Sequence, residues 1–222
     1  MKEKILFSWS GGKDSALALH TLQQDGGFEI AALFTTVTAP YDRISMHGVR
    51  VALLEKQAAS LGLALEKITI GSNCGFNEWE EKIAAVLLRH KVAGITAVAF
   101  GDIFLEDLKK YREENLAKIG LKGVFPIWKQ ESGALAKRFI DLQFKAVITC
   151  VDGKKLDGKF SGRDYDAALL KDLPADVDCC GENGEFHSFV YAGPNFNKAV
   201  SFSNGPVVLR DKQFYFCDLI PD

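Results

Sequence analysis

The stretch Ser8-Trp9-Ser10-Gly11-Gly12-Lys13-Asp14-Ser15 decides the fold, because a strand pattern precedes it and a helix pattern follows it. Residues 5–7 are a continuous apolar run, and apolar residues recur at helical spacing over 16–22. Two adjacent glycines allow a sharp bend that brings backbone N–H groups close to a ligand, and the helix N-terminus adds partial positive charge. With its lysine and its serine hydroxyls, this loop suits a polyphosphate.

The spacing of the loop excludes the two commonest nucleotide-binding loops. A Walker A loop needs four residues between its first glycine and Gly-Lys-Ser/Thr, whereas here the glycines are adjacent and Asp14 separates Lys13 from Ser15. The pattern Gly-x-Gly-x-x-Gly of dinucleotide-binding proteins is also absent from this stretch. Ser10 to Ser15 instead resembles the pyrophosphate loop (PP-loop) of the N-type ATP pyrophosphatases, which cut ATP between the α and β phosphates.

Composition is that of an ordinary globular protein. The chain has 222 residues, 47% of them hydrophobic and 25% charged, with a net charge of −2. The weak negative charge argues against a nucleic-acid surface, since binding phosphates takes several Lys or Arg on one face. No stretch reaches the ~20 apolar residues of a membrane span, so we expect no membrane association and a cytoplasmic location. Five cysteines without C-x-x-C spacing predict reduced thiols rather than disulfides or a zinc site.

Strand and helix patterns alternate along the first half of the chain. Strands are expected after the loop at 29–37, 64–70 and 95–100, and the intervening segments carry helical apolar stripes. This alternation predicts an α/β fold with a parallel sheet and helices on both faces, and the resemblance of the loop to a PP-loop implies that the sheet is Rossmann-like (HUP-type). Ligands of such sheets bind at the carboxyl ends of the strands. The rule brings the loop, Thr35-Thr36 and Gly101-Asp102 to one rim.

From about residue 126 the pattern changes to turns and alternating aromatic residues. A strand at 146–151 could still extend the first sheet, and residues 210–213 predict a hairpin turn. We therefore expect two domains. Residues 1–126 would form the ATP-binding α/β domain, and residues 127–222 a smaller, mixed α+β domain that binds the substrate.

Three further motifs narrow the family. Phe100-Gly101-Asp102-Ile103 is followed by Arg112, residues 44–50 contain His47 and Arg50, and residues 180–188 read Cys-Gly-Glu-Asn-Gly-Glu-Phe-His-Ser. Together with the loop, these motifs resemble the diphthine–ammonia ligase family over nearly the whole chain. Family members usually have a proline where this chain has Cys179, a departure that affects the shape of the loop rather than its chemistry.

The resemblance implies an ATP-dependent, AMP-forming amide ligase. A carboxylate would be adenylated, pyrophosphate would leave, and ammonia would attack the acyl adenylate. The implied cofactors are ATP and Mg²⁺, and free ammonium is the nitrogen donor. The acceptor would be diphthine on elongation factor 2 in an archaeal or eukaryotic source, and otherwise a small metabolite.

Each candidate residue then receives a role. The groups that carry the chemistry would be Lys13, Asp102, Glu182, Glu185 and His187, because carboxylates and an imidazole can bind ammonium and move its proton. Mg²⁺ would be held by Asp14 and Asp102. The nucleotide would be bound by Ser8, Ser10, Gly11, Gly12, Lys13, Asp14, Ser15, Thr35, Thr36 and Gly101, and the acceptor by His47, Arg50, Arg112 and Asn183.

Two other functions stay open at this point. The first is a PP-loop enzyme that modifies tRNA by thiolation or lysidine formation, and the second is a non-catalytic nucleotide sensor of the universal-stress type. Lys13 and the carboxylates of the second region argue against a sensor. His47 and His187 could also serve only structural hydrogen bonds, and a homodimer is compatible with the sequence.

Overall fold

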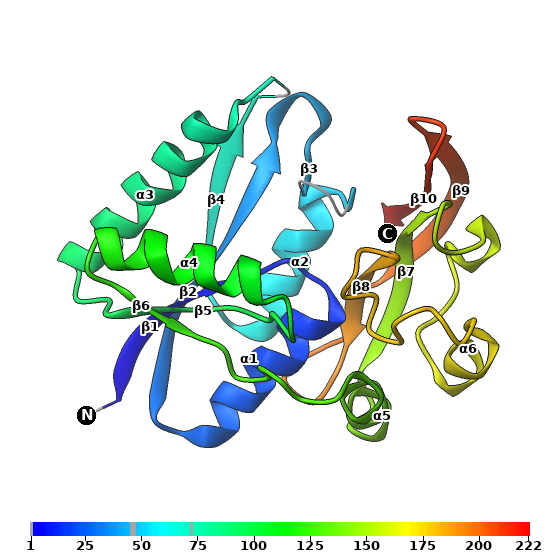
Figure 1. Ribbon diagram of the computed structural model, residues 1–222, viewed down its shortest axis with the longest axis horizontal. Helices are drawn as coiled ribbons and strands as arrows, with labels where there is room; N and C mark the ends of the chain where they lie inside the picture. Colours follow the sequence, from blue (N-terminus) through cyan, green and yellow to red (C-terminus); the bar gives the residue numbers. More distant parts are fainter. Residues whose placement is uncertain (1, 45–47, 72) are drawn as a thin grey trace.

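The computed structural model describes residues 2–44, 48–71 and 73–222, whose strands form two separate sheets (Figure 1). The first sheet has the order β3-β2-β1-β5-β6, and β4 pairs with β2 outside this path. The pairs β1–β2, β1–β5, β2–β4 and β5–β6 are parallel, and β2–β3 is antiparallel. Its strands are β1 (Glu3–Ser8), β2 (Phe28–Thr38), β3 (Arg43–Ile44), β4 (Leu65–Ile70), β5 (Ala97–Ala99) and β6 (Lys122–Val124).

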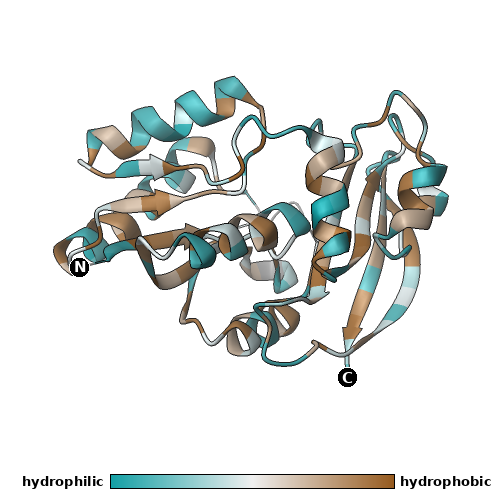
Figure 2. Cartoon of the chain, turned by 90° about the horizontal axis from the view of Figure 1, so that it is seen from below, coloured by the Kyte–Doolittle hydropathy of each residue, from teal (hydrophilic) through white to brown (hydrophobic). Residues whose placement is uncertain are grey.

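Helices cover both faces of this sheet, as the sequence predicts. Alternate residues of β1 point to opposite faces, so Phe7 enters one apolar core and Leu6 the other. The first core takes residues of α1 (Lys13–Asp25) and α2 (Val51–Leu61), and the second takes Leu87 and Leu116 from α3 (Phe76–Val92) and α4 (Glu106–Lys118). Each such buried side chain contributes ~1.5–3 kcal/mol. Figure 2 shows the result, with brown strands inside and helices whose outward faces are largely teal.

The strand order reverses direction at β1, and this brings the loops after β1 and β5 together. β1 pairs with β2 on one side and with β5 on the other, so the loops after β1 and β5 leave the same edge next to each other. The approach is close enough to require glycine: a Cβ on Gly101 would lie 2.8 Å from the backbone nitrogen of Ser15. The sequence prediction that these two loops meet at one rim is confirmed.

The second sheet is antiparallel, with the order β8-β7-β10-β9. It is built of β7 (Lys145–Asp152), β8 (Phe186–Ala192), β9 (Phe202–Arg210) and β10 (Phe214–Pro221), with α5 (Ser132–Asp141) and α6 (Ala167–Asp172) packed beside it. The expectation that the strand at 146–151 could extend the first sheet is wrong, because β8 and β10 occupy its two edges. The predicted hairpin turn is present, and Asp211 and Lys212 there both have positive φ. Short 3₁₀ turns occupy Ala39–Tyr41 and Gly158–Phe160.

β8 of the second sheet rests directly on the loop after β1. The N–H of Val190 donates to the carbonyl oxygen of Gly11 at 2.9 Å. Gln57 of α2 is fully buried and bridges the same groups, donating to the carbonyl oxygens of Gly11 at 2.9 Å and Val190 at 2.6 Å while accepting from Trp9 Nε1 at 3.0 Å. One apolar core runs through both parts of the chain. Among the described helices, none is long and apolar enough to cross a membrane.

Candidate active site

The glycine loop has the geometry expected of an anion-binding turn. Gly11 has φ +79°, a left-handed value that favours glycine, and a Cβ there would lie 2.8 Å from Gln57 Oε1. Gly12 is the N-cap of α1 and has no side-chain cap, so the first turn of the helix presents its N–H groups to the rim. The loop is therefore bent by its first glycine and faces the site with its second.

Hydroxyl groups contact the backbone amides of the loop. Ser10 Oγ accepts from the N–H of Gly12 at 3.2 Å and lies 2.5 Å from Ser15 Oγ. Ser188 Oγ, at the start of β8, accepts from the N–H of Lys13 at 3.1 Å. The amides of the loop thus already point at oxygen atoms, one of which comes from the second sheet.

Lys13 is almost fully buried, with 4% of its surface exposed. Its Nζ donates to both oxygens of Asp14, at 2.9 and 2.7 Å, and to the carbonyl oxygen of Cys180. The rings of Phe186 and Tyr165 lie 5.5 and 5.7 Å from Nζ. Burial is the largest single influence and acts to lower the pKa of Lys13, but Asp14 and the other acidic groups around the ammonium together raise it. Lys13 is therefore a fixed positive charge between the loop and the second region.

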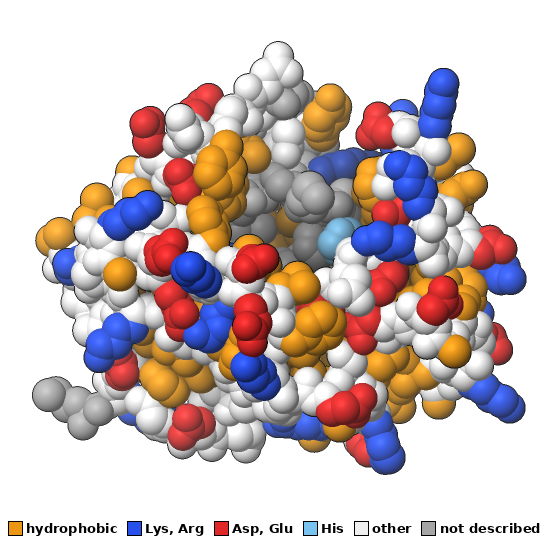
Figure 3. Space-filling view, in the orientation of Figure 1, with side chains coloured by type: hydrophobic (Ala, Val, Ile, Leu, Met, Phe, Trp, Pro, Cys, Tyr) orange, Lys and Arg blue, Asp and Glu red, His pale blue; other side chains and the backbone are white. Residues whose placement is uncertain are grey.

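Two adjoining cavities open at this rim, and Figure 3 shows the centre of this face hollowed between the two parts of the molecule. The first, which we call the polar cavity, has a volume of about 380 Å³. Predicted site residues dominate its lining, and they come from the loop, from the segment after β5, from α4 and from the segment before β8. They are Ser8, Ser10, Gly12, Lys13, Asp14, Ser15, Gly101, Asp102, Arg112, Glu182 and His187.

The second, the apolar cavity, has a volume of about 420 Å³ and lies between α3, α4 and the ends of β1 and β2. The predicted Thr35 and Thr36 line it together with Trp79 and Tyr111. Both cavities share Ser8, Ser10, Phe100 and Arg112, so they adjoin. The aromatic residues of α3 and α4 are missed by sequence reasoning, since a helical apolar stripe does not reveal whether it packs on the sheet or lines a cavity.

Asp102 and Arg112 meet at the boundary of the two cavities. Arg112 pairs with both oxygens of the Asp102 carboxylate: its Nη2 donates a hydrogen bond to Oδ1 at 3.3 Å, and its Nε forms an ion pair with Oδ2 at 2.7 Å. The guanidinium also stacks over the ring of Phe100, 4.3 Å from its centroid. Burial raises the pKa of Asp102 even though Arg112 acts to lower it. Oδ2 is buried and, among the described residues, has the guanidinium of Arg112 as its ion-pair partner but receives no well-aligned hydrogen bond.

Glu182 is the carboxylate of the second region that enters the polar cavity. Its Oε1 accepts from the N–H of Ile103 at 2.9 Å, which ties the loop before β8 to the segment after β5. Burial raises the pKa of Glu182 from 4.5 to about 7, although the bond from Ile103 acts in the opposite direction. A carboxylate that titrates near neutrality is suited to act as a general base.

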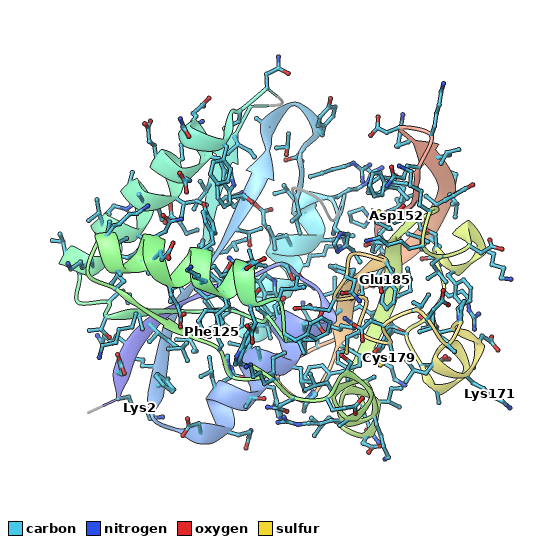
Figure 4. All side chains as sticks on the ribbon, in the orientation of Figure 1. Lys2, Phe125, Asp152, Lys171, Cys179 and Glu185 are labelled. Carbon is cyan, nitrogen blue, oxygen red and sulfur yellow. The ribbon has the colours of Figure 1, made fainter. Side chains whose placement is uncertain are left out.

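Glu185 occupies a different place from the predicted one. It lies in the part of the chain that carries the second sheet, with 4% of its surface exposed (Figure 4), and it lines neither cavity. Its Oε1 accepts from the N–H of Asp178 at 3.1 Å and from Asn183 Nδ2 at 3.2 Å. Glu185 and Asn183 thus hold the shape of the turn that presents Glu182.

Three predicted site residues remain: His187, Arg50 and His47. His187 lines the polar cavity, and burial lowers its pKa to about 4, so its ring is neutral at pH 7. Arg50 lies outside both cavities, and its guanidinium pairs with Asp218 at 2.6 Å, as does that of Arg43 at 2.9 Å. These pairs connect β3 and the start of α2 to β10. His47 lies outside the described residues.

The fold and the loop define a nucleotide-binding protein of the PP-loop class. Residues 1–123 match the model of the diphthamide synthase N-terminal domain, and residues 131–216 match that of the diphthamide synthase C-terminal domain. The chain belongs to the diphthamide synthase family.

Curated relatives carry the name diphthine–ammonia ligase. The chain is 25% identical to the protein of Homo sapiens over 223 residues and 26% identical to that of Mus musculus over 224 residues, covering 90% of this chain and 83% of each relative. A solved structure, a predicted subunit of tRNA methyltransferase from Methanocaldococcus jannaschii, matches with a TM-score of 0.45 and 16% identity over 86% of this chain and 98% of that one. The family confirms the predicted resemblance and supports an ATP-dependent ligase over a tRNA-modifying enzyme or a sensor.

Proposed function

We propose that this protein cleaves ATP between the α and β phosphates and uses the resulting acyl adenylate to join ammonia to a carboxylate. The observation that carries the proposal is the composition of the polar cavity. Its lining offers the loop amides and Lys13, which suit a departing pyrophosphate, together with Glu182, whose pKa of about 7 suits a base. We also propose that residues 1–126 bind the nucleotide and residues 127–222 the acceptor.

ATP would span the two cavities. The nucleoside fits the apolar cavity, where Trp79 and Tyr111 offer aromatic surface, and the phosphates fit the polar cavity beside the loop. Arg112 lines both cavities, so its guanidinium would face the α phosphate, where the carboxylate attacks. This gives Arg112 a nucleotide-binding role in place of the acceptor-binding role expected from the sequence.

In the first step, an oxygen of the acceptor carboxylate attacks the α phosphorus and the bond to the β-phosphate oxygen breaks. Negative charge gathers on the pyrophosphate, and the amides of Gly12 and Lys13, the Lys13 ammonium and the Ser15 hydroxyl would stabilise it. To contact the pyrophosphate, Lys13 Nζ would exchange its hydrogen bonds to Asp14 and Cys180 for bonds to phosphate oxygens.

Mg²⁺ fits the donor set of this cavity. Among the described residues no group of three His, Cys, Asp or Glu side chains forms a metal cage. Mg²⁺ bound to nucleotide phosphates takes only one or two protein carboxylates. Asp102 and Asp14, whose carboxylates line the cavity and pair with Arg112 and Lys13, would hold the ion, which would neutralise phosphate charge when bound.

In the second step, Glu182 takes a proton from ammonium, and the ammonia that forms attacks the acyl carbon. AMP leaves with the electrons of the broken acyl–oxygen bond, and the new amide loses one further proton. A neutral His187 in the same cavity can accept or donate a hydrogen bond but carries no charge that would repel ammonium. The names of the relatives make diphthine the first acceptor to test and small carboxylate metabolites the second.

The experiment incubates the protein with ATP, Mg²⁺, ¹⁵N-ammonium and elongation factor 2 bearing diphthine. We expect AMP and pyrophosphate in equal amounts, and ¹⁵N in the acceptor. Lys13→Ala is the matched loss-of-function variant, and Lys110→Ala, on an exposed part of α4, is the control that keeps activity. ADP and phosphate as products would refute the proposed cleavage, and AMP formation without ¹⁵N incorporation would refute the ligation step.

A further inference from the structure

The apolar cavity contains a hydrogen-bonded carboxylate that the reaction scheme does not use. Glu80, on α3, lines the cavity together with Tyr111 and Asn115 of α4. Tyr111 Oη donates to Glu80 Oε1 at 2.5 Å, and Asn115 Nδ2 donates to the same oxygen at 3.0 Å. Burial, followed by the bond to Glu80, raises the pKa of Tyr111 to about 12, so Tyr111 remains a donor at neutral pH. Glu80 is thus held in one position by two side chains of the facing helix.

Both of these bonds go to Oε1. Oε2 receives no hydrogen bond or ion pair from any residue that the structure describes, and it is not one of the buried unpartnered atoms. Glu80 therefore presents one fixed, accessible acceptor oxygen in a mostly apolar cavity. A ligand that enters this cavity gains from a hydroxyl or amine donor at that point, because hydrogen bonds to a charged group are about twice as strong as neutral ones.

The position of Glu80 along the site indicates which part of a nucleotide meets it. Leu108 of α4 lines the polar cavity, Arg112 lines both cavities, and Asn115 lines only the apolar one. Asn115 is three residues beyond Arg112, ~4.5 Å further along the helix axis. Leu116 and Ile119 continue the apolar lining in the same direction. A nucleotide with its α phosphate at Arg112 would place its sugar beside Asn115 and its base beyond.

We propose that Glu80 binds the ribose hydroxyls of ATP and makes the protein select ribonucleotides over deoxyribonucleotides. Carboxylates bind ribose hydroxyls in other nucleotide-binding folds, because an ionised carboxylate is an acceptor only and the vicinal hydroxyls are donors. The inference rests on the proposed placement of ATP across the two cavities. Tyr111 and Asn115 act as positioning residues for this contact, since both donate to Glu80 Oε1 and so orient its carboxylate.

The test is the affinity for ATP, 2′-deoxy-ATP and 3′-deoxy-ATP, measured by calorimetry for the full chain. We expect the wild-type protein to bind at least one deoxynucleotide about tenfold more weakly than ATP. Glu80→Ala should bind ATP as weakly as that deoxynucleotide, so the ratio of affinities falls to about one. Glu81→Gln is the matched control: Glu81 also lines the cavity but is exposed and makes no bond to α4 among the described residues, so the ratio should persist.

Other outcomes distinguish the possible failures. Equal affinity of the wild-type protein for all three nucleotides would overturn the ribose proposal, as would a ratio that persists in Glu80→Ala. If inosine triphosphate binds poorly but the deoxynucleotides bind as well as ATP, the nucleobase rather than the ribose contacts Glu80, and the ribose proposal is overturned. If Glu80→Ala does not fold, Glu80→Gln preserves the shape of the side chain, and the ratio should still fall. ADP as the reaction product would refute the proposed function while leaving a ribose preference intact.

Discussion

Replacing Glu182 with glutamine tests the base and the physical origin of its pKa at once. Glu182→Gln keeps the size of the side chain and an oxygen that can accept from the N–H of Ile103, but it removes the charge. We expect the nitrogen-transfer step to slow by ~10²–10⁴-fold, the usual contribution of a general base. Adenylation, followed as acceptor-dependent exchange of labelled pyrophosphate into ATP, should continue because the loop is untouched.

The same substitution should stabilise the protein above neutral pH. The folded state raises the pKa of Glu182 from 4.5 to about 7, so it binds a proton that the unfolded state releases between these values. Stability is therefore lost as pH rises from about 4.5 to about 7, and the loss stays at higher pH. At ~1.4 kcal/mol per pKa unit, the cost is on the order of 3 kcal/mol as an upper limit, and partial exposure of the site reduces it. Glutamine does not carry this cost.

The assay is urea denaturation at pH 5 and pH 8, combined with the pH dependence of ¹⁵N incorporation. We expect Glu182→Gln to be more stable than the wild-type protein at pH 8 by ~1–3 kcal/mol, with a smaller difference at pH 5. The wild-type rate should rise with pH to a plateau with an inflection near 7, and the variant should lack the inflection. His187 cannot supply it, since its pKa is about 4.

Glu114→Gln, on an exposed part of α4, is the control, and it should change neither the free energy of unfolding nor the pH dependence of ¹⁵N incorporation. A Glu182→Gln protein with the wild-type pH profile would rule out Glu182 as the base. Equal stability of variant and wild type at pH 8 would show that burial does not raise the pKa as argued.

Two further substitutions test the support of the loop. Gly101→Ala would bring a Cβ to 2.8 Å from Ser15 N, so we expect a loss of ~1–3 kcal/mol in urea denaturation and at least tenfold weaker ATP binding by calorimetry. A stable variant with wild-type affinity would show that the two loops can separate without cost. Gln57→Ala would remove three buried hydrogen bonds and should lower the free energy of unfolding by ~2–5 kcal/mol, whereas a loss below ~1 kcal/mol would mean that water replaces the amide.

Much of the fold follows from the sequence because local patterns determine it. The strand, glycine turn and helix around Gly11 and Gly12 are fixed by apolar periodicity and backbone freedom, and the rim follows from the handedness of parallel connections. The strand at 146–151 could not be placed in the same way. An apolar run reveals that a strand is buried but not which strands flank it, and here the partners come from residues 186–192 and 214–216.

Many residues that line the polar cavity could be predicted from the sequence, but their contacts and distances could not. Glu182 and Glu185 cannot be told apart by their local sequence, because each directly follows a glycine in the same turn-like stretch. Their surroundings differ because the turn directs Glu182 into the polar cavity and buries Glu185 against Asn183 and the backbone of Asp178. Arg50 shows the same limit, since its partner Asp218 lies 168 residues away in the chain. Long-range pairing of this kind leaves no local signal.

The contacts of β8 connect the two halves of the proposed reaction. Ser188 accepts the N–H of Lys13, so a phosphate that takes this amide must compete with a side chain of the second sheet. Six residues before it, Glu182 accepts the N–H of Ile103, directly after the loop that packs on α1. One short segment, 182–188, thus connects the proposed base, Glu182, to the loop after β5 and the hydroxyl of Ser188 to the loop after β1. A nucleotide that displaces Ser188 would therefore act on the same segment that positions Glu182. Binding of phosphates at the loop would in this way be linked to the position of Glu182, the proposed base.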